Sequence, residues 1–174
     1  MIYILIPVLN EEGNIAPLTL NLDASLKKTG EGYHLIFVND GSTDKTPEVI
    51  RDEMETFPIE LLENITNQGP GRSFDRGFRF FLTKAKDEDI LITIEGDNTS
   101  DSATIVEMIQ TIREGKDFVL ASCYAKRGKM VRCPPGRRFL SICANFLCRL
   151  VLGIKGVRTY SSFYRAYSHK TIKQ

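Results

Sequence analysis

Short apolar runs alternate with longer amphipathic segments over the first 121 residues of the chain. The apolar runs are rich in β-branched residues and predict strands at 2–8, 33–38, 59–62, 90–94 and 118–121. Apolar residues spaced three and four apart predict the helices between them, at 14–28, 44–55, 71–84 and 102–113. We expect Asp44 to be the N-cap of the second helix. This alternation predicts an α/β fold, with a mainly parallel sheet and helices on both of its faces.

Clusters of polar residues follow three of the predicted strands. These clusters are Asn10 to Glu12, Asn39 to Asp44, and Glu95 to Asp97. In open α/β sheets, ligands bind outside the carboxyl ends of the strands, and these ends share one edge of the sheet. We therefore expect the three clusters to form one site. The alternative is that they are three unrelated solvated loops, because loops are polar in general.

The cluster Glu95-Gly96-Asp97 places two carboxylates at the end of a buried strand. Gly96 can bend the chain so that both acids point toward one position outside the sheet. Hard cations such as Mg²⁺ and Mn²⁺ prefer oxygen ligands of this kind, particularly when they also hold a diphosphate. Taken alone, the same residues also fit a solvated acidic turn.

Charge is distributed unevenly along the chain, although the net charge is only +1. All 22 Asp and Glu residues occur at or before Asp117, together with 11 Lys and Arg residues, whereas the other 12 basic residues follow it. The part up to Asp117 therefore has a net charge of −11, and the part after it has a net charge of +12. A basic part of this size predicts an anionic partner: phosphates, a membrane surface or nucleic acid. Alternatively, it covers the acidic part within one fold.

The cysteines and the N-terminus exclude some functions. The four cysteines include no Cys-x-x-Cys pair, so we expect no zinc site and reduced thiols. The apolar start ends at Pro7 and has no basic flank, so it does not resemble a cleavable signal. No apolar stretch reaches the roughly 18–20 residues of a membrane span.

After residue 121 the pattern changes. A loop rich in Gly and Pro carries six basic residues, namely Lys126, Arg127, Lys129, Arg132, Arg137 and Arg138. Residues 139–152 then predict a helix that is apolar nearly all round. This helix is either buried in the core or lies in a membrane interface beside the basic loop.

Together these motifs resemble the family 2 glycosyltransferases with a GT-A fold, and among them the polyprenyl-phosphate monosaccharide synthases. The matching segments occur in family order and span essentially the whole chain: Ile6–Glu12, Val38–Asp44, Asn67–Gly71, Glu95–Asp97, Arg138–Ser141 with Ala144–Phe146, and Ser161–Tyr167. The resemblance implies one catalytic domain, 1–174, with a nucleotide-sugar-binding part at 1–122 and a basic acceptor-side part at 123–174. Because the family continues past this point, we expect the acceptor side to be truncated at Gln174.

The resemblance also implies roles for individual residues. Asp97 would bind the metal, and Glu95 would contact the metal, its bound water or the ribose. Arg165 would contact phosphate in a catalytic role or only support the site. Other substrate contacts would come from Pro7, Leu9, Glu11, Val38, Asp40, Gly69, Gly96, Arg127 and Arg138.

Three positions depart from the family pattern. Glu95 replaces the usual first aspartate and is one methylene longer, so its reach to the metal or ribose is open. Thr159 stands where many relatives have an acid, and Cys123 stands where some synthases have an arginine.

The acceptor follows from the charge pattern. A sugar hydroxyl needs a general base, usually a carboxylate late in the domain, and no acid follows Asp117. A phosphate acceptor is already anionic and needs cations instead. We therefore expect inverting transfer from a UDP- or GDP-linked sugar to polyprenyl phosphate, with Mg²⁺ or Mn²⁺, by a protein peripheral to or anchored on the cytoplasmic face of a membrane.

Other functions remain as alternatives. A family 2 enzyme extending a cell-surface glycan and a degenerate nucleotide-sugar-binding module both fit the motifs. A sugar-1-phosphate nucleotidyltransferase would need a glycine-rich loop with Arg after the first strand, where this chain is acidic. We expect no nucleic-acid partner, because no nucleic-acid-binding motif is recognisable.

Overall fold

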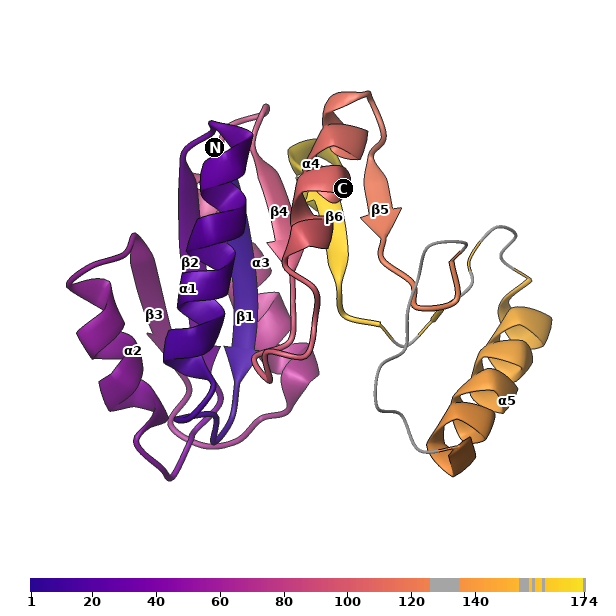
Figure 1. Ribbon diagram of the computed structural model, residues 1–174, viewed down its shortest axis with the longest axis horizontal. Helices are drawn as coiled ribbons and strands as arrows, with labels where there is room; N and C mark the ends of the chain where they lie inside the picture. The colour runs from indigo at the N-terminus through magenta and orange to yellow at the C-terminus, as the bar shows by residue number, and fades with distance from the viewer. Residues whose placement is uncertain (126–134, 154–156, 158, 161, 174) are drawn as a thin grey trace.

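The computed structural model describes residues 1–125, 135–153, 157, 159–160 and 162–173, and for positions 135, 137, 138 and 152 it describes the backbone alone. Residues 126–134 of the predicted basic loop lie outside the described residues, whereas its last residues, 135–138, form the first turn of helix α5 (Pro135–Leu152) and not a loop. Six strands form one sheet in the order β3-β2-β1-β4-β6-β5 (Figure 1). Their bounds are β1 Ile2–Val8, β2 Tyr33–Asn39, β3 Ile59–Glu63, β4 Ile90–Thr93, β5 Phe118–Leu120 and β6 Arg165–Ser168.

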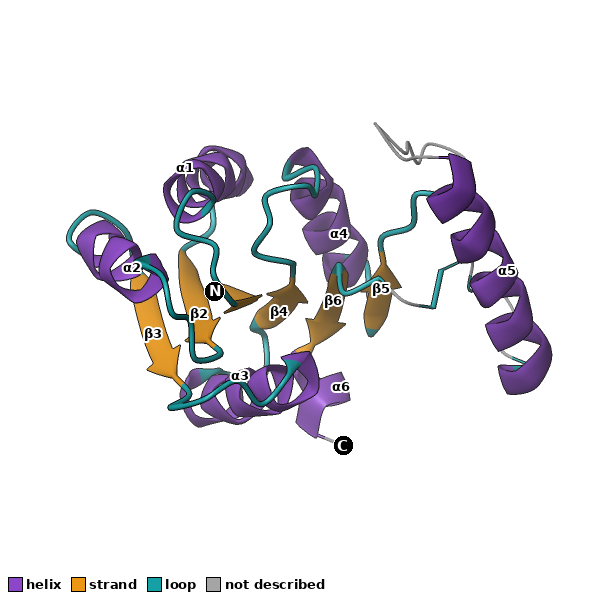
Figure 2. Ribbon diagram, turned by 90° about the horizontal axis from the view of Figure 1, so that it is seen from below, coloured by secondary structure: helices purple, strands orange, loops and turns teal. Residues whose placement is uncertain are grey.

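Helices cover both faces of the sheet, as the sequence predicts. Figure 2 shows α1, α2 and α4 on one face and α3 and α6 on the other. The helices are α1 Ile15–Leu26, α2 Thr46–Met54, α3 Pro70–Lys84, α4 Ala103–Arg113, α5 Pro135–Leu152 and α6 His169–Lys173, with a 3₁₀ turn η1 at Lys27–Thr29. The predicted α/β fold class is therefore confirmed.

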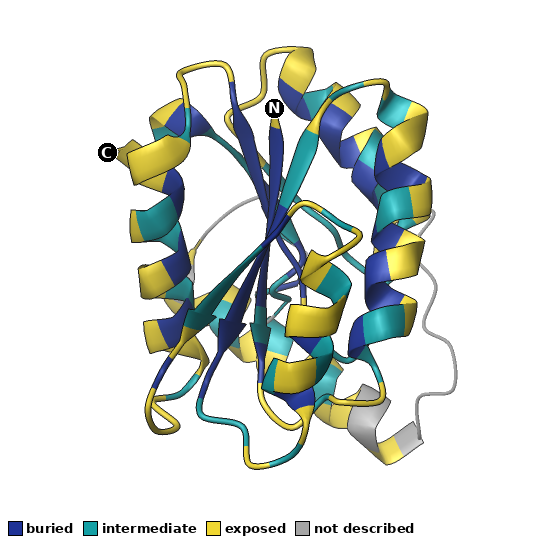
Figure 3. Ribbon diagram, turned by 90° about the vertical axis from the view of Figure 1, so that its left-hand side faces the viewer, coloured by how far each residue is buried: buried dark blue, intermediate teal, exposed yellow. Residues whose placement is uncertain are grey.

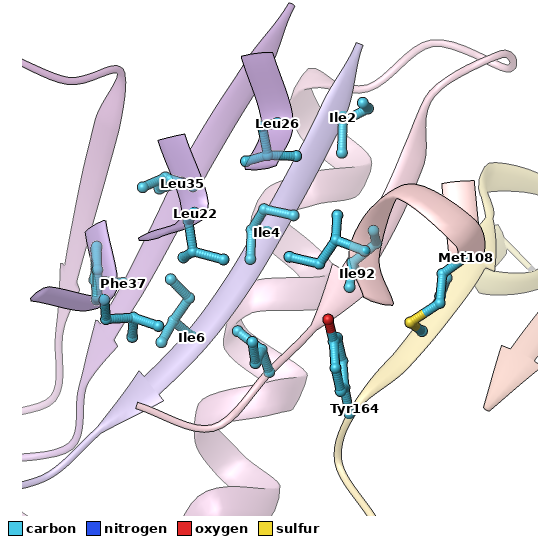
Figure 4. Packing of buried hydrophobic residues seen from close by; sticks show 14 of the residues in the cluster. Ile2, Ile4, Ile6, Leu22, Leu26, Leu35, Phe37, Ile92, Met108 and Tyr164 are labelled. Atoms are coloured by element: carbon cyan, nitrogen blue, oxygen red, sulfur yellow. The ribbon is translucent and has the colours of Figure 1, made fainter. Parts of the chain in front are cut away.

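The central strand β1 organises the core. It pairs in parallel with β2 on one side and β4 on the other, and six of its seven residues are buried. Because side chains alternate between the two faces of a strand, Ile4 packs with the α1 and α4 side while Leu5 packs with the α3 side. Figure 4 shows Ile2, Ile4 and Ile6 along the first of these faces. Figure 3 shows the buried strands between helices whose outer surfaces are exposed.

The sequence did not predict β6. This strand runs antiparallel between β4 and β5, so Ala166 lies opposite both Ile92 and Val119. Only Ala166 of its four residues is fully buried, and the segment carries no apolar run that would mark it. The segment forms a strand because β4 and β5 pair with it on both sides, so β6 depends on tertiary pairing.

The predicted cap of α2 is displaced by one residue. Lys45 occupies the N-cap position, and its side chain makes no capping bond. Asp44 instead accepts a hydrogen bond from the backbone N–H of Thr46 at 3.0 Å and one from the N–H of Glu12 at 3.2 Å. The carboxylate therefore serves the start of the helix and also ties it to the loop after β1.

The helix α5 is not a core helix. It stands apart from the sheet, beyond β5 (Figures 1 and 2). Its apolar side chains are exposed, from 47% for Ile142 to 75% for Val151. Of the two alternatives for this helix, burial in the core is therefore wrong, because no layer of the fold covers this apolar surface in the described part of the chain.

Replacing Gly77 by Ala should destabilise the fold. An added Cβ would lie 2.1 Å from Cδ1 of Leu5, whose side chain is fully buried. Overpacking costs about 1–3 kcal/mol, whereas alanine gains only about 1 kcal/mol over glycine in a helix. We expect G77A to lower the free energy of unfolding by up to about 2 kcal/mol in urea titrations.

The matched control is Gly71→Ala in the same helix, because an added Cβ there meets nothing within 4 Å. This variant should be as stable as the parent or slightly more stable. A G77A protein of unchanged stability would contradict the close packing of α3 on β1.

Candidate functional site

A pocket of about 210 Å³ opens at the carboxyl ends of β1 and β4. The loop after β1, the start of α3, the loop after β4 and the segment before β6 all contribute to it. Its lining residues are Pro7, Glu11, Pro70, Phe74, Glu95, Gly96, Asp97 and Phe163. The structure therefore brings together five residues that the sequence predicts for the site: Pro7, Glu11, Glu95, Gly96 and Asp97.

The two acids after β4 differ in their surroundings. Glu95 is exposed, whereas Asp97 is half-buried. Oδ1 of Asp97 accepts hydrogen bonds from the backbone N–H and the hydroxyl of Thr99, at 3.0 and 2.8 Å. These bonds fix the orientation of the Asp97 carboxylate at the pocket.

Gly96 allows the loop after β4 to approach β1 closely. A Cβ at this position would lie 2.6 Å from Cγ1 of Val8 and 3.1 Å from the backbone oxygen of Pro7. Only a residue without a side chain fits there undisturbed. The glycine between the acids therefore serves packing, and it keeps both carboxylates beside the end of β1.

The loop after β1 is tied to the loop after β2 by reciprocal hydrogen bonds. Asn10, with φ of 56°, donates its N–H to Oγ of Ser42 at 2.9 Å and accepts the N–H of Thr43 at 2.8 Å. The N–H of Glu11 donates to the buried Oγ1 of Thr46 at 2.8 Å. These bonds fix Glu11 at the pocket, and they could not be foreseen from sequence because the partners lie over 30 positions apart.

Asp40 is buried just after β2 and accepts hydrogen bonds from several donors. Oδ1 accepts Nδ2 of Asn64 at 2.8 Å and the N–H of Gln68 at 3.0 Å, and Oδ2 accepts the N–H of Gly69 at 2.8 Å. Burial alone would raise the pKa of Asp40, but the bonds from Asn64, from the two backbone N–H groups and from the side chain of Ser73 outweigh it and lower the pKa below its ordinary value. Asp40 is therefore an ionised carboxylate that holds the loop before α3.

The remaining predicted residues differ in their placement. Leu9 is exposed beside the pocket, and Gly69 bonds Asp40. Val38 has no exposed surface and packs in the α3-side cluster, so its side chain does not reach the pocket surface. Arg127 lies outside the described residues, and of Arg138 only the helical backbone is described.

Arg165 supports the segment before β6. Its Nε donates to the backbone oxygen of Ser162 at 2.7 Å, and Nη2 donates to that of Tyr160 at 3.3 Å. The guanidinium also lies 6.0 Å from the ring centroid of Phe163. These contacts give Arg165 the supporting role, and a direct contact with phosphate stays a prediction.

The sequence-based prediction missed the aromatic wall of the pocket. The rings of Phe74 and Phe163 lie 5.0 Å apart, one on α3 and the other just before β6. The sequence alone marks Phe74 only as one of the spaced apolar residues of the predicted helix 71–84. The motif that ends at Gly71, about one helical turn before Phe74, was the available signal that the start of α3 lies at the site. Phe163 had no such signal, because it reaches the pocket only through the pairing of β6.

The two pocket carboxylates fit a divalent cation that brings its other ligands with it. Within the described residues, no group of three or more His, Cys, Asp or Glu side chains is placed to hold a metal. Mg²⁺ is commonly bound by one or two carboxylates together with substrate phosphates and water. Asp97 and Glu95 therefore fit a metal–diphosphate complex better than a metal bound by the protein alone.

The described part of the chain contains no helix that is both long enough and apolar enough to cross a bilayer.

The sheet and the pocket at its carboxyl edge define a glycosyltransferase fold of the GT-A type. Glucosyl-3-phosphoglycerate synthase from Mycobacterium tuberculosis, in complex with Mn²⁺, UDP and glucosyl-3-phosphoglycerate, has this fold. It matches with a TM-score of 0.68 and 18% identity, over 98% of this chain and 57% of that one.

The chain belongs to glycosyl transferase family 2, whose family model matches residues 3–174. This confirms the resemblance drawn from the motifs. The dolichol-phosphate mannosyltransferase of Pyrococcus furiosus is 27% identical over 149 residues, which are 86% of this chain and 40% of that protein. The undecaprenyl-phosphate mannosyltransferase of Micrococcus luteus is 26% identical over 170 residues, which are 97% of this chain and 67% of that protein. The chain thus spans between two fifths and two thirds of the length of these relatives.

Replacing Asp40 by Asn should destabilise the protein in a pH-dependent way. The amide places an NH₂ group where the carboxylate accepts a backbone N–H, which leaves buried donors unpaired and costs about 1–3 kcal/mol. Because folding lowers the pKa of Asp40, its stabilisation is present above the unfolded pKa of about 3.9 and is lost as pH falls through the folded value. Urea titrations should show a deficit at pH 7 that shrinks toward pH 2.5.

The control is Asp52→Asn, which removes the same charge from the exposed face of α2. Its stability should change little at either pH. An Asp40→Asn deficit that is equally large at both pH values would contradict a role for the ionised carboxylate.

Proposed function

We propose that this protein is an inverting glycosyltransferase that moves a monosaccharide from a nucleoside-diphosphate sugar to a polyprenyl phosphate. The observation that carries the proposal is the convergence of Glu11, Glu95 and Asp97 on one pocket at the carboxyl edge of the sheet. The names of the relatives from Pyrococcus and Micrococcus support the choice of a polyprenyl phosphate acceptor. The family membership supports sugar transfer as the reaction.

On the donor side, the nucleoside would lie between the loops after β1 and β2. Pro7 and Glu11 line the pocket, and Glu11 can accept hydrogen bonds from ribose hydroxyls. Asp40 lies behind Gly69 and would accept an N–H of the base. Asp97, assisted by Glu95, would hold Mg²⁺ or Mn²⁺ against the diphosphate. Such a cation neutralises the negative charge that develops on the leaving group.

The reaction would be a single displacement at the anomeric carbon. An oxygen of the acceptor phosphate forms the new bond while the bond to the diphosphate breaks, and the electron pair leaves with the nucleoside diphosphate. Attack from the face opposite the leaving group inverts the configuration. The acceptor oxygen is already anionic, so this step requires no general base, which agrees with the absence of acids among residues 118–174.

The helix α5 supports a membrane-bound acceptor. Ser141 and Asn145 lie on one side of it, where Ser141 accepts the hydroxyl of Tyr124 at 2.8 Å and Asn145 accepts the N–H of Tyr160 at 2.8 Å. At about 100° per residue, Phe146 and Leu150 lie on the other side. Both side chains are more than 60% exposed. A helix anchored on its polar side with a free apolar face suits a membrane interface.

Basic residues would complete the acceptor side. Arg127 and Arg138 precede or begin α5 in the sequence, within a part of the chain that holds 12 cations and no acid. Cations there would bring the acceptor phosphate close to the anionic donor. The protein would then act on the cytoplasmic face of a membrane, where polybasic segments bind anionic lipid.

Removal of the Asp97 carboxylate should uncouple nucleotide binding from the metal. For the parent protein we expect a nucleoside diphosphate to bind at least about tenfold tighter with Mn²⁺ than without it, as a linked metal site requires. Asp97→Asn should abolish most of this difference, while binding without metal changes little. Isothermal titration calorimetry measures both affinities.

Asp75→Asn is the matched control, because it removes an exposed carboxylate of α3 away from the pocket and should leave the metal effect intact. Nucleotide binding by the parent protein with no metal effect at all would point instead to a degenerate binding module.

The acceptor is tested by supplying labelled nucleotide sugar and polyprenyl phosphate in vesicles, with Mg²⁺ or Mn²⁺. We expect metal-dependent label in the lipid phase. Leu150→Ser should lower lipid labelling several-fold, because it places a polar group on the apolar face of α5. Nucleotide affinity should not change, because α5 does not line the pocket.

Leu20→Ser is the control, because Leu20 is a comparably exposed leucine on α1. Label in a soluble glycan, with none in lipid, would overturn the acceptor assignment in favour of a family 2 enzyme that extends a glycan. Equal effects of the two leucine variants would contradict the role of α5.

A further inference from the structure

The aromatic wall of Phe74 and Phe163 is the apolar part of a pocket that also holds three acids. Both rings line the pocket together with Glu11, Glu95 and Asp97, and both are only half-buried. Ligand pockets combine an apolar lining of this kind with a few polar groups that orient the ligand. In the proposed function the acids serve the ribose, the metal and the diphosphate, so the rings are available for another part of the donor.

The surrounding structure fixes both rings. Phe74 stacks on Phe78 of the same helix, with the ring centroids 6.2 Å apart and the ring planes inclined by 26°. The backbone oxygen of Phe163 accepts the hydroxyl of Thr93, a buried residue at the end of β4. The aromatic wall therefore has a defined position beside the loop that follows β4.

The strand order places Phe163 at one end of the pocket. Along the carboxyl edge the end of β2 comes first, then the ends of β1 and β4, and then the start of the antiparallel strand β6 (Figure 1). Phe163 comes two residues before the start of β6. Neighbouring strands lie about 4.8 Å apart, so β6 is about 10 Å from β1 along this edge. Measured from β1 and β2, Phe163 therefore lies beyond the end of β4.

The parts of a nucleotide sugar follow one another in a matching order. The diphosphate lies between the nucleoside and the transferred sugar and is bonded to both. In the proposed function, the nucleoside lies at the loops after β1 and β2, and the metal holds the diphosphate at the loop after β4. The sugar then continues toward β6, where the aromatic wall stands.

We propose that Phe74 and Phe163 contact the transferred sugar of the donor, with C–H groups of the sugar ring packed against the aromatic wall. This rests on the proposed function, because it requires the diphosphate to lie at Asp97. A sugar ring presents C–H groups as well as hydroxyls, and contact of the C–H groups with the rings removes apolar surface from water. The two phenylalanines are thus substrate-binding residues for the part of the donor that is transferred.

The test compares ligands that differ by the sugar alone. UDP and UDP-glucose, and GDP and GDP-mannose, are titrated by calorimetry with saturating Mn²⁺. The variants are then measured with the pair whose diphosphate binds the parent protein more tightly. We expect Phe163→Ala to weaken binding of the nucleotide sugar about three- to tenfold, which is the range for one aromatic contact. Binding of the nucleoside diphosphate should stay the same.

A second variant and a control complete the test. Phe74→Ala should cause the same selective loss, and it tests the same contact if Phe163→Ala does not fold. Phe118→Ala is the matched control, because Phe118 is 44% exposed on β5 and does not line the pocket. This variant should leave both affinities unchanged.

The outcomes separate this inference from the proposed function. Equal losses for the nucleotide sugar and the diphosphate would place the rings against the nucleoside or the phosphates, and would overturn the sugar contact alone. Unchanged affinities in Phe163→Ala and Phe74→Ala would overturn it as well. A parent protein that binds none of the four nucleotides would overturn the proposed function itself.

Discussion

The parallel pairing of β1 with β2 and β4 is the constraint on which the rest of the structure depends. β1 is buried on both faces, so its register with its two neighbours is fixed by the cores above and below it. A slip by one residue would exchange Ile4 and Leu5 between two different clusters. The same register brings the ends of the three strands level, and with them the loops that carry Glu11, Asp40 and Asp97. The position of the site is thus a consequence of how the core packs.

The loops at this edge are held by polar contacts between distant segments. Asn10 and Thr46 bind the loops after β1 and β2 together, and Asp40 gathers the N–H groups that precede α3. The bonds made by Thr46 and Asp40 involve partly buried backbone N–H groups that would be costly to leave unpaired. A site of this kind is preorganised, because its carboxylates are oriented before any ligand arrives. Asp40 illustrates the consequence: the bonds that order the loop also limit what the carboxylate can still bind.

Residues 1–121 and the helix α5 show opposite patterns of burial. Residues 1–121 bury most of their apolar side chains between the sheet and the helices. The helix α5 does the reverse, since Phe146, Leu147 and Leu150 remain exposed while Asn145 bonds back toward Tyr160. An exposed apolar helix face is a recognised mark of an interaction site. In the proposed function, the donor is bound by the preorganised edge of the sheet and the lipid acceptor is approached through this helix.

The sequence by itself determined the local elements and the class of site. Periodicity placed the first five strands and four helices close to their observed ends, because burial on one or both faces leaves a regular apolar pattern. The sequence also indicated where the site lies. Glu11 and Asp97 follow predicted strands, and parallel strands share one carboxyl edge. Tertiary structure alone decided the insertion of β6 between β4 and β5, the aromatic wall of Phe74 and Phe163, and the exposure of α5. These features depend on pairing and packing between segments far apart in the chain, and such contacts leave no periodic signal in either segment.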